Sequence, residues 1–155
     1  MANVQAMCSS FKKELLCGTH ALGTQAANGI RTVVTKDVVK AALYLSSASR
    51  GAADTAYTVT GEVSDASYTA GGVVVTNSTE PSAPSTTAFW TPSASIVFTN
   101  VTLTSPFNCV MLYNNSSTGK LAISVHTFGD QTVTAGNFTL TMPTNDASNA
   151  LIRIA

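Results

Sequence analysis

Apolar and polar residues alternate along most of the chain, as they do in β-strands with one buried face. Segments with this pattern cover residues 30–35, 38–46, 56–64, 68–77, 94–103, 107–114, 120–128, 132–143 and 150–155. The pattern predicts about eight strands at the short spacing typical of sandwiches and barrels. No long helical segments lie between them to build parallel βαβ units. We therefore predict an all-β fold, an antiparallel β-sandwich of the jelly-roll type.

Several details refine this pattern. A turn or bulge is predicted at Gly71-Gly72, and a loop at 78–87, where two prolines lie among Ser and Thr. A hairpin is predicted over 107–128, with its turn at "NNSSTG". The alternation also assigns residues to faces. In the segment 94–103, it places on one face Val97, Thr99, Val101 and Leu103. In the segment 107–114, it places on one face Phe107, Cys109, Met111 and Tyr113, and on the opposite face Val110 and Leu112.

One segment near the N-terminus has a helical period instead. Its apolar residues, spaced to form one face, are Met7, Phe11, Leu15 and Leu16. Ser9 or Ser10 is suited to cap the start, and Gly18 to occupy the position just past the end. We predict a helix within 7–17, an N-terminal helix and arm over 1–29, and a sandwich domain over 30–155.

Composition restricts the partners. Eight basic and eight acidic residues cancel, and only 10% of residues are charged. Nucleic-acid binding needs a basic excess, so no nucleic-acid partner is expected. No apolar run approaches a membrane span, and the charges at Lys12, Lys13 and Glu14 interrupt any signal-peptide core. We expect synthesis in the cytoplasm, no membrane partner, and a weakly charged surface suited to packing against other proteins.

Candidate catalytic groups are sparse. His126 reads as a strand histidine in phase with Ala122, Ser124 and Phe128, and Cys109 as a buried apolar residue. Cys8, Cys17 and His20 match no compact zinc signature. The carboxylates form no recognisable pair, and Gly71-Gly72 lacks the residues of a phosphate loop. No enzyme activity, cofactor or metal is therefore predicted.

The single tryptophan, Trp90, follows Phe89 in "AFWTP". Two interpretations stay open for it. It could form a flat platform for a sugar or a base, or it could cap the sandwich or contact another subunit.

Three segments, read in order, resemble a family of small virion structural proteins of tailed bacteriophages. They are "YTVTGEVSDASYTAGGVVVTN" (57–77), "VMLYNNSSTGKLAISVHTFGDQTVTAGNFTLTMP" (110–143) and "ALIRIA" (150–155). The resemblance implies a β-rich, non-enzymatic component of the virus particle. Its first implication is a jelly-roll cement or decoration protein on the capsid surface, which bridges major capsid subunits as a homo-oligomer, a dimer or a trimer.

Two alternatives remain: a tail- or fibre-associated structural protein, or a carbohydrate-binding β-sandwich module. For contact with the capsid or another subunit, the candidate residues are Phe11, Lys12, Lys13, Leu15, Leu16 and Trp90. Two interpretations also stay open for the apolar face of the helix: it packs on the sandwich of its own chain, or it contacts a neighbouring subunit. The second predicts that removal of residues 1–17 leaves a folded sandwich that attaches poorly.

Overall fold

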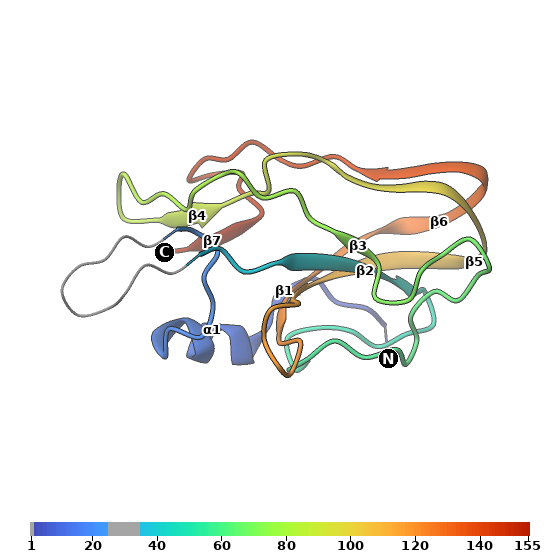
Figure 1. The fold of residues 1–155 in the computed structure, drawn as a ribbon, viewed down its shortest axis with the longest axis horizontal. Helices are drawn as coiled ribbons and strands as arrows, with labels where there is room; N and C mark the ends of the chain where they lie inside the picture. Colours follow the sequence, from blue (N-terminus) through green and yellow to red (C-terminus); the bar gives the residue numbers. More distant parts are fainter. Residues whose placement is uncertain (1, 25–34) are drawn as a thin grey trace.

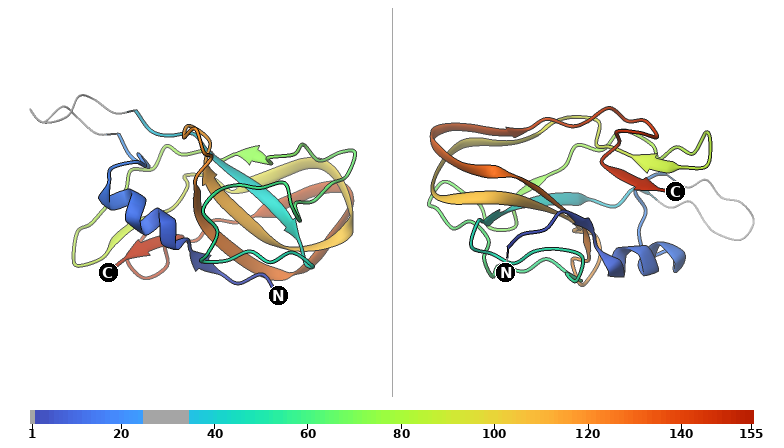
Figure 2. Two further views of the ribbon diagram at one scale, coloured as in Figure 1. Left: turned by 90° about the horizontal axis from the view of Figure 1, so that it is seen from below. Right: turned by 180° about the vertical axis from the view of Figure 1, so that it is seen from behind.

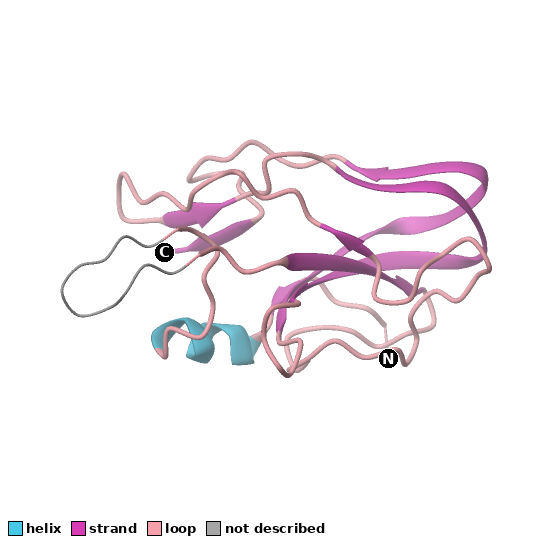
Figure 3. Cartoon of the chain, in the orientation of Figure 1, coloured by secondary structure: helices cyan, strands magenta, loops and turns pink. Residues whose placement is uncertain are grey.

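The computed structural model describes residues 2–24 and 35–155 (Figure 1). The elements in chain order are β1 (Ala6–Met7), α1 (Ser9–Leu16), β2 (Val39–Leu45), β3 (Val73–Val74), β4 (Ala88–Trp90), β5 (Ile96–Asn114), β6 (Ala122–Leu140) and β7 (Ile152–Ile154). In this part of the chain, strands and loops dominate and α1 is short (Figure 3). The predicted boundary at 29/30, and nearly all of the strand predicted at 30–35, lie outside the described residues.

All strand pairs are antiparallel, which confirms the predicted all-β sandwich class. The main sheet has five strands in the order β1-β6-β5-β2-β3, and β4 pairs with β7 in a small second sheet. A jelly roll has two four-stranded sheets. The arrangement here differs because one long strand pair contributes to both layers.

That pair is β5 and β6, which are 19 residues each. They pair from Tyr113–Ala122 beside the turn to Ile96–Leu140 at the far end. Figures 1 and 2 show the ribbon curling back, so that its far half lies over its near half and β2. The predicted hairpin over 107–128 is therefore confirmed, and the segments predicted on either side extend the same two strands.

A bulge explains an error in the predicted faces. Asn100 has a positive φ of 53°, and the pairing register shifts between Phe98 and Val101. An extra residue inverts the alternation beyond it. Ile96 and Phe98 therefore face the core before the bulge, Val101 and Leu103 face it after the bulge, and Val97 is partly exposed. The prediction that Val97 and Thr99 share a face with Val101 and Leu103 was wrong.

Apolar side chains fill both sides of the near half of the ribbon. Between the layers, Phe107 lies 4.9 Å from Phe138 and 6.0 Å from Phe128, measured between ring centroids. On the opposite side, the ring of Tyr113 stacks on Tyr57 at 4.7 Å. Phe107 thus leaves the face predicted for it, because the adjacent residues Leu45 and Tyr44 of β2 pair with Phe107 and Cys109, which leaves Asn108 as an extra residue in β5. Cys109 is fully buried, as predicted.

Helix α1 differs from the prediction at its start and agrees with it at its end. Its N-cap is Cys8, and no side chain caps it, so the predicted serine cap was wrong; Ser10 Oγ instead donates to the Asp54 carbonyl at 3.4 Å. The predicted role of Gly18 is confirmed: its φ is 69°, and its N–H donates to the Leu15 carbonyl. Thr19 N–H donates to the Glu14 carbonyl, which completes a Schellman motif.

The segment predicted as a strand over 56–64 is instead an irregular loop with isolated bridges at Ala56–Leu121 and Tyr44–Glu62. Its backbone turns at Gly61, where φ is 76°. Hydrogen bonds to the Glu62 carboxylate, such as that from the Tyr57 hydroxyl, fix the path of the loop. The predicted turn at Gly71-Gly72 is confirmed by φ values of 85° and 65°.

Candidate functional site

A groove lies between α1 and β7. Its outer hollow, of about 550 Å³, is lined by Met7, Lys12, Leu15, Leu16, Arg153 and Ile154, with Ala155 at the end. Its inner hollow, of about 280 Å³, is lined chiefly by Leu22, Pro81, Phe89, Trp90 and Ile152. Leu15 and Ile154 line both hollows, so we treat them as one feature, the α1–β7 groove.

The groove exposes apolar side chains at its mouth. Leu16 is 91% exposed and Ile154 is 44% exposed, although both lie beside well-buried residues. Single exposed apolar residues are common on protein surfaces. Two of them at one hollow with an apolar floor are typical of a contact surface instead.

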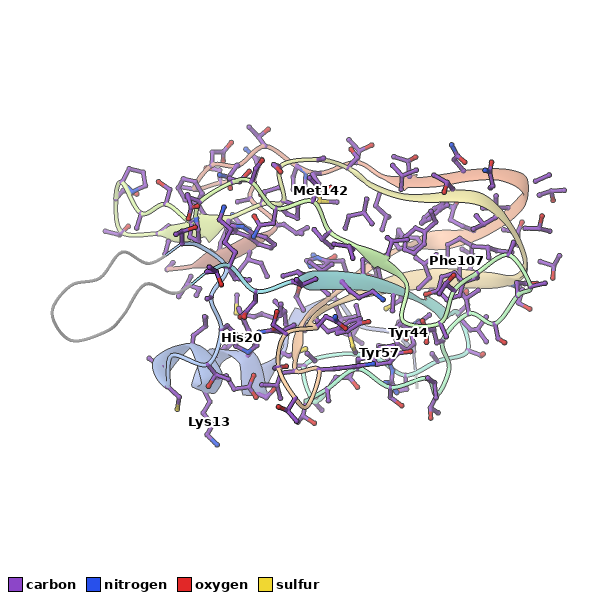
Figure 4. The ribbon with its side chains drawn as sticks, in the orientation of Figure 1. Lys13, His20, Tyr44, Tyr57, Phe107 and Met142 are labelled. Atoms are coloured by element: carbon purple, nitrogen blue, oxygen red, sulfur yellow. The ribbon has the colours of Figure 1, made fainter. Side chains whose placement is uncertain are left out.

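The residues predicted for partner contact gather largely at this groove. Lys12, Leu15 and Leu16 line its outer hollow. Lys13, the next residue on the helix, is exposed, and in Figure 4 its side chain points away from the body of the protein. The prediction that Leu16 widens the buried face of the helix was wrong, because its side chain lies almost entirely in solvent.

Two predicted contact residues are buried within the chain. Phe11 is 0% exposed and Trp90 is 1% exposed, and both form part of the wall of the inner hollow. Trp90 Nε1 donates to Asn77 Oδ1 at 3.0 Å. A buried indole with its N–H satisfied cannot present a flat face to a sugar or a base, so Trp90 supports the groove and does not itself reach a partner.

A polar cluster lies behind the groove. His20 Nε2 lies 2.7 Å from Glu14 Oε2, and its Nδ1 lies 3.1 Å from Asn114 Nδ2. Asn114 Nδ2 also donates to Asp37 Oδ2 at 2.6 Å. Because an amide nitrogen only donates, Nδ1 accepts, and Nε2 carries the proton toward Glu14. Both ring nitrogens are therefore engaged, and the cluster joins Glu14 of α1 to Asn114 at the end of β5.

The thiols do not form a metal site in the described part of the chain. Burial raises the pKa of Cys8 and of Cys109 to about 12, with nearby Asp54 adding to the effect, whereas Cys17 is exposed. Cys8 Sγ points to the Gly51 carbonyl. Among residues 2–24 and 35–155, no group of three or more His, Cys, Asp or Glu side chains is arranged to hold a metal ion.

A second polar cluster surrounds the buried carboxylate of Glu62. Tyr57 hydroxyl donates to Oε2 at 2.6 Å, and Tyr68 hydroxyl and Gly71 N–H donate to Oε1 at 2.8 and 2.7 Å. Burial and the Glu62 charge raise the pKa of Tyr57 and of Tyr68 well above the ordinary value. Figure 4 shows Tyr57 beside Tyr44 in this region. The carboxylate is fully satisfied, so the cluster organises the loops and does not offer a free acid or base.

His126 occupies the strand position predicted for it. It shares a face with Ser124, whose Oγ lies 2.9 Å from His126 Nε2. Burial lowers the pKa of His126 from 6.5 to about 4, so the imidazole is neutral near pH 7. The residue borders a polar hollow that also contains Arg153 and Asn149. Thr87 contributes a hydroxyl to that hollow, and among the described residues no Asp or Glu side chain lines it.

Sequence reasoning missed the β7 side of the groove. The alternation predicts the terminal strand over 150–155, but it does not show that this strand pairs with β4, which had not been recognised. The pairing places Ile154 opposite Ala88 and beside α1, over 130 positions away in the chain. The only local signal for β4 was the aromatic pair Phe89-Trp90.

Comparisons with known proteins add no relative: no protein-family profile, curated protein or solved structure matches this chain. In the described residues, the one helix is too short and too polar to cross a membrane.

Proposed function

We propose that this chain is a non-enzymatic structural protein of a bacteriophage virion, which binds the outer surface of the capsid and stabilises the shell by bridging major capsid subunits. The ordered resemblance of 57–77, 110–143 and 150–155 to small virion proteins supports the class. The observation that carries the binding role is the α1–β7 groove, an apolar and basic surface on a chain with few charges.

The fold is suited to such a task for physical reasons. Phe11 of α1 and Ile152 of β7 both lie in the hydrophobic core, so the two walls of the groove are anchored before a partner binds, which lowers the entropy cost of binding. Many copies on one shell act together, so each contact can be small while the total stabilisation is large. We further propose that the chain acts as a homo-oligomer, a dimer or a trimer, on the particle.

The test uses particles from which the protein is absent. Shells of the major capsid protein are mixed with the purified chain, sedimented, and compared with untreated shells by thermal denaturation. The proposal expects saturable co-sedimentation and a higher melting temperature of the shells. Binding to isolated tails in place of shells, with no change in shell stability, would reject the capsid role in favour of a tail role. Sedimentation equilibrium of the free chain tests the oligomer.

A further inference from the structure

On the edge of β7 that faces away from β4, the backbone groups make no hydrogen bond to any other described residue. Phe89 N–H and C=O both bond to Ser82, so they point away from β7. Arg153 lies opposite Phe89 in the β4–β7 register. In an antiparallel pair, such positions do not exchange hydrogen bonds. The N–H and C=O of Arg153 therefore point outward from the small sheet.

The outer hollow of the α1–β7 groove lies along that edge. Arg153, Ile154 and Ala155 form one wall, and Lys12, Leu15 and Leu16 of α1 form the other. Its volume of about 550 Å³ is enough for several residues of extended chain. An unpaired strand edge that faces an apolar hollow is the arrangement in which an added strand gains both backbone bonds and side-chain contacts.

The charges select the chemistry of the added strand. The two charged side chains that line the outer hollow, Lys12 and Arg153, are both basic. Even with a carboxylate on Ala155, the last residue of the sequence, the lining would keep a net positive charge. Arg153 donates one guanidinium hydrogen to the Ser148 carbonyl and retains further donors on the same group.

We propose that the α1–β7 groove binds an extended segment of the major capsid protein, with alternating apolar and acidic residues, as a third strand beside β7. The segment pairs with the N–H and C=O of Arg153, packs its apolar side chains on Leu15, Leu16 and Ile154, and places a carboxylate near Lys12. The identity of the partner rests on the proposed function, whereas the chemistry of the segment rests on the groove alone.

A second copy of this chain fits the groove less well. Most of its carboxylates already accept hydrogen bonds within their own chain; these are Glu14, Asp37, Asp54, Glu62, Glu80, Asp130 and Asp146. Transferring one of them to another subunit would leave its present partners unsatisfied, which costs free energy.

The chemistry of the groove is tested by nuclear magnetic resonance with the full chain. Two blocked six-residue peptides serve as probes, one of alternating valine and glutamate and the other of alternating valine and lysine. We expect the glutamate peptide to give saturable shifts of the Arg153 amide and of the Leu16 and Ile154 methyl groups, and the lysine peptide to give none. Equal responses to both peptides, or shifts only elsewhere, would overturn the proposal.

The partner is tested by shell binding with matched variants. Lys12→Glu should weaken binding by about tenfold or more, whereas Lys13→Glu, at the neighbouring exposed lysine, should stay within about twofold. Leu16→Asp should weaken it similarly, with Val59→Asp, at a valine 66% exposed elsewhere, as control. Thermal unfolding verifies that each variant is folded.

The outcomes separate the two proposals. If wild-type chain binds shells and Lys12→Glu binds equally well, the groove assignment is overturned and the proposed function stands. If the wild-type chain does not bind shells, the proposed function is overturned, and the peptide titration alone decides whether the groove takes an acidic strand. A dimer in sedimentation equilibrium that Leu16→Asp converts to monomer would assign the groove to a second copy and overturn the capsid partner.

Discussion

Glu62 accepts a hydrogen bond from the backbone N–H of Gly71 at 2.7 Å, so one buried carboxylate determines the path of two loops. The same carboxylate receives the hydroxyls of Tyr57 and Tyr68. Next to it, the Tyr113 hydroxyl donates to the Gly71 carbonyl at 2.7 Å, which fixes the turn from its other side. The irregular segment between β2 and β3 is therefore ordered by side chains in place of a strand ladder.

The first prediction concerns this carboxylate. Glu62→Ala leaves two hydroxyls and one N–H without their acceptor, and we expect the free energy of unfolding to fall by about 3–5 kcal/mol. Tyr57→Phe removes a single donor and should cost about 1 kcal/mol. Urea denaturation of both variants measures the difference. Equal losses for the two variants would show that the carboxylate does not act as the common acceptor.

The second prediction concerns the turn that the carboxylate holds. A Cβ on Gly72 would overlap the carbonyl group of Ala41 on β2, and its φ of 65° disfavours other residues. Gly72→Ala should therefore lower the free energy of unfolding by about 3 kcal/mol or more. Gly129→Ala is the control, because a Cβ there meets nothing within 4 Å. The control should change stability by less than about 0.5 kcal/mol in the same denaturation assay.

The third prediction separates the two faces of α1. Phe11→Ala removes a fully buried ring from the core and should lower the free energy of unfolding by about 3–5 kcal/mol. Leu16→Ala, on the same helix but almost fully exposed, should change it by less than about 0.5 kcal/mol. Thermal denaturation of the two variants measures the contrast. A small effect of Phe11→Ala would show that the helix is dispensable for folding.

That contrast changes the expectation for a larger deletion. β1 pairs with β6, and Cys8 and Phe11 lie in the core, so a chain without residues 1–17 would lose part of its sheet and part of its core. We now expect such a chain to be unfolded or strongly destabilised, in contrast to the folded sandwich predicted from sequence. Point variants at the surface of α1 are therefore the better probes of attachment.

The fourth prediction concerns pH. Burial lowers the pKa of His126 to about 4 in the folded chain, from 6.5, so between these values the unfolded chain binds a proton that the folded chain does not. The contribution of this group to stability is complete above pH 6.5 and is lost as the pH falls toward 4. Urea denaturation across this range should show a smaller decrease for His126→Gln than for the wild type. Parallel curves would contradict the lowered pKa.

The sequence predicted correctly those features whose residue pattern and whose structure have the same local physical cause. Alternation of apolar residues predicted the β class and the hairpin over 107–128, because burial on one side produces that period directly. Gly18 and the Gly71-Gly72 turn were predicted because only glycine adopts such φ values at little cost. These are local effects, and a local pattern is enough to reveal them.

The errors came from non-local effects. The bulge at Asn100 inverts the faces of β5, yet nothing in the surrounding residues distinguishes it from an ordinary exposed asparagine. The segment over 56–64 alternates like a strand, but it forms a loop. The buried Glu62 carboxylate needs hydrogen-bond donors, and this need outweighs the β-propensity of the segment. The helix residues that line the α1–β7 groove had been named from sequence only as contact candidates, and the groove itself depends on the β4–β7 pairing between distant segments.

The bent ribbon of β5 and β6 also has a consequence for how the chain folds. Its pairs extend, with bulges between them, from Tyr113–Ala122 near the turn to Ile96–Leu140, and each pair shortens the loop that the next must close. We expect the β5–β6 pairing to form progressively from the turn. The far half of the ribbon, which lies over the near half and β2, would then form last. Variants near Tyr113 should then slow refolding, whereas Phe98→Leu should mainly speed unfolding in stopped-flow experiments. The opposite assignment would mean that the layers meet before the ribbon has closed.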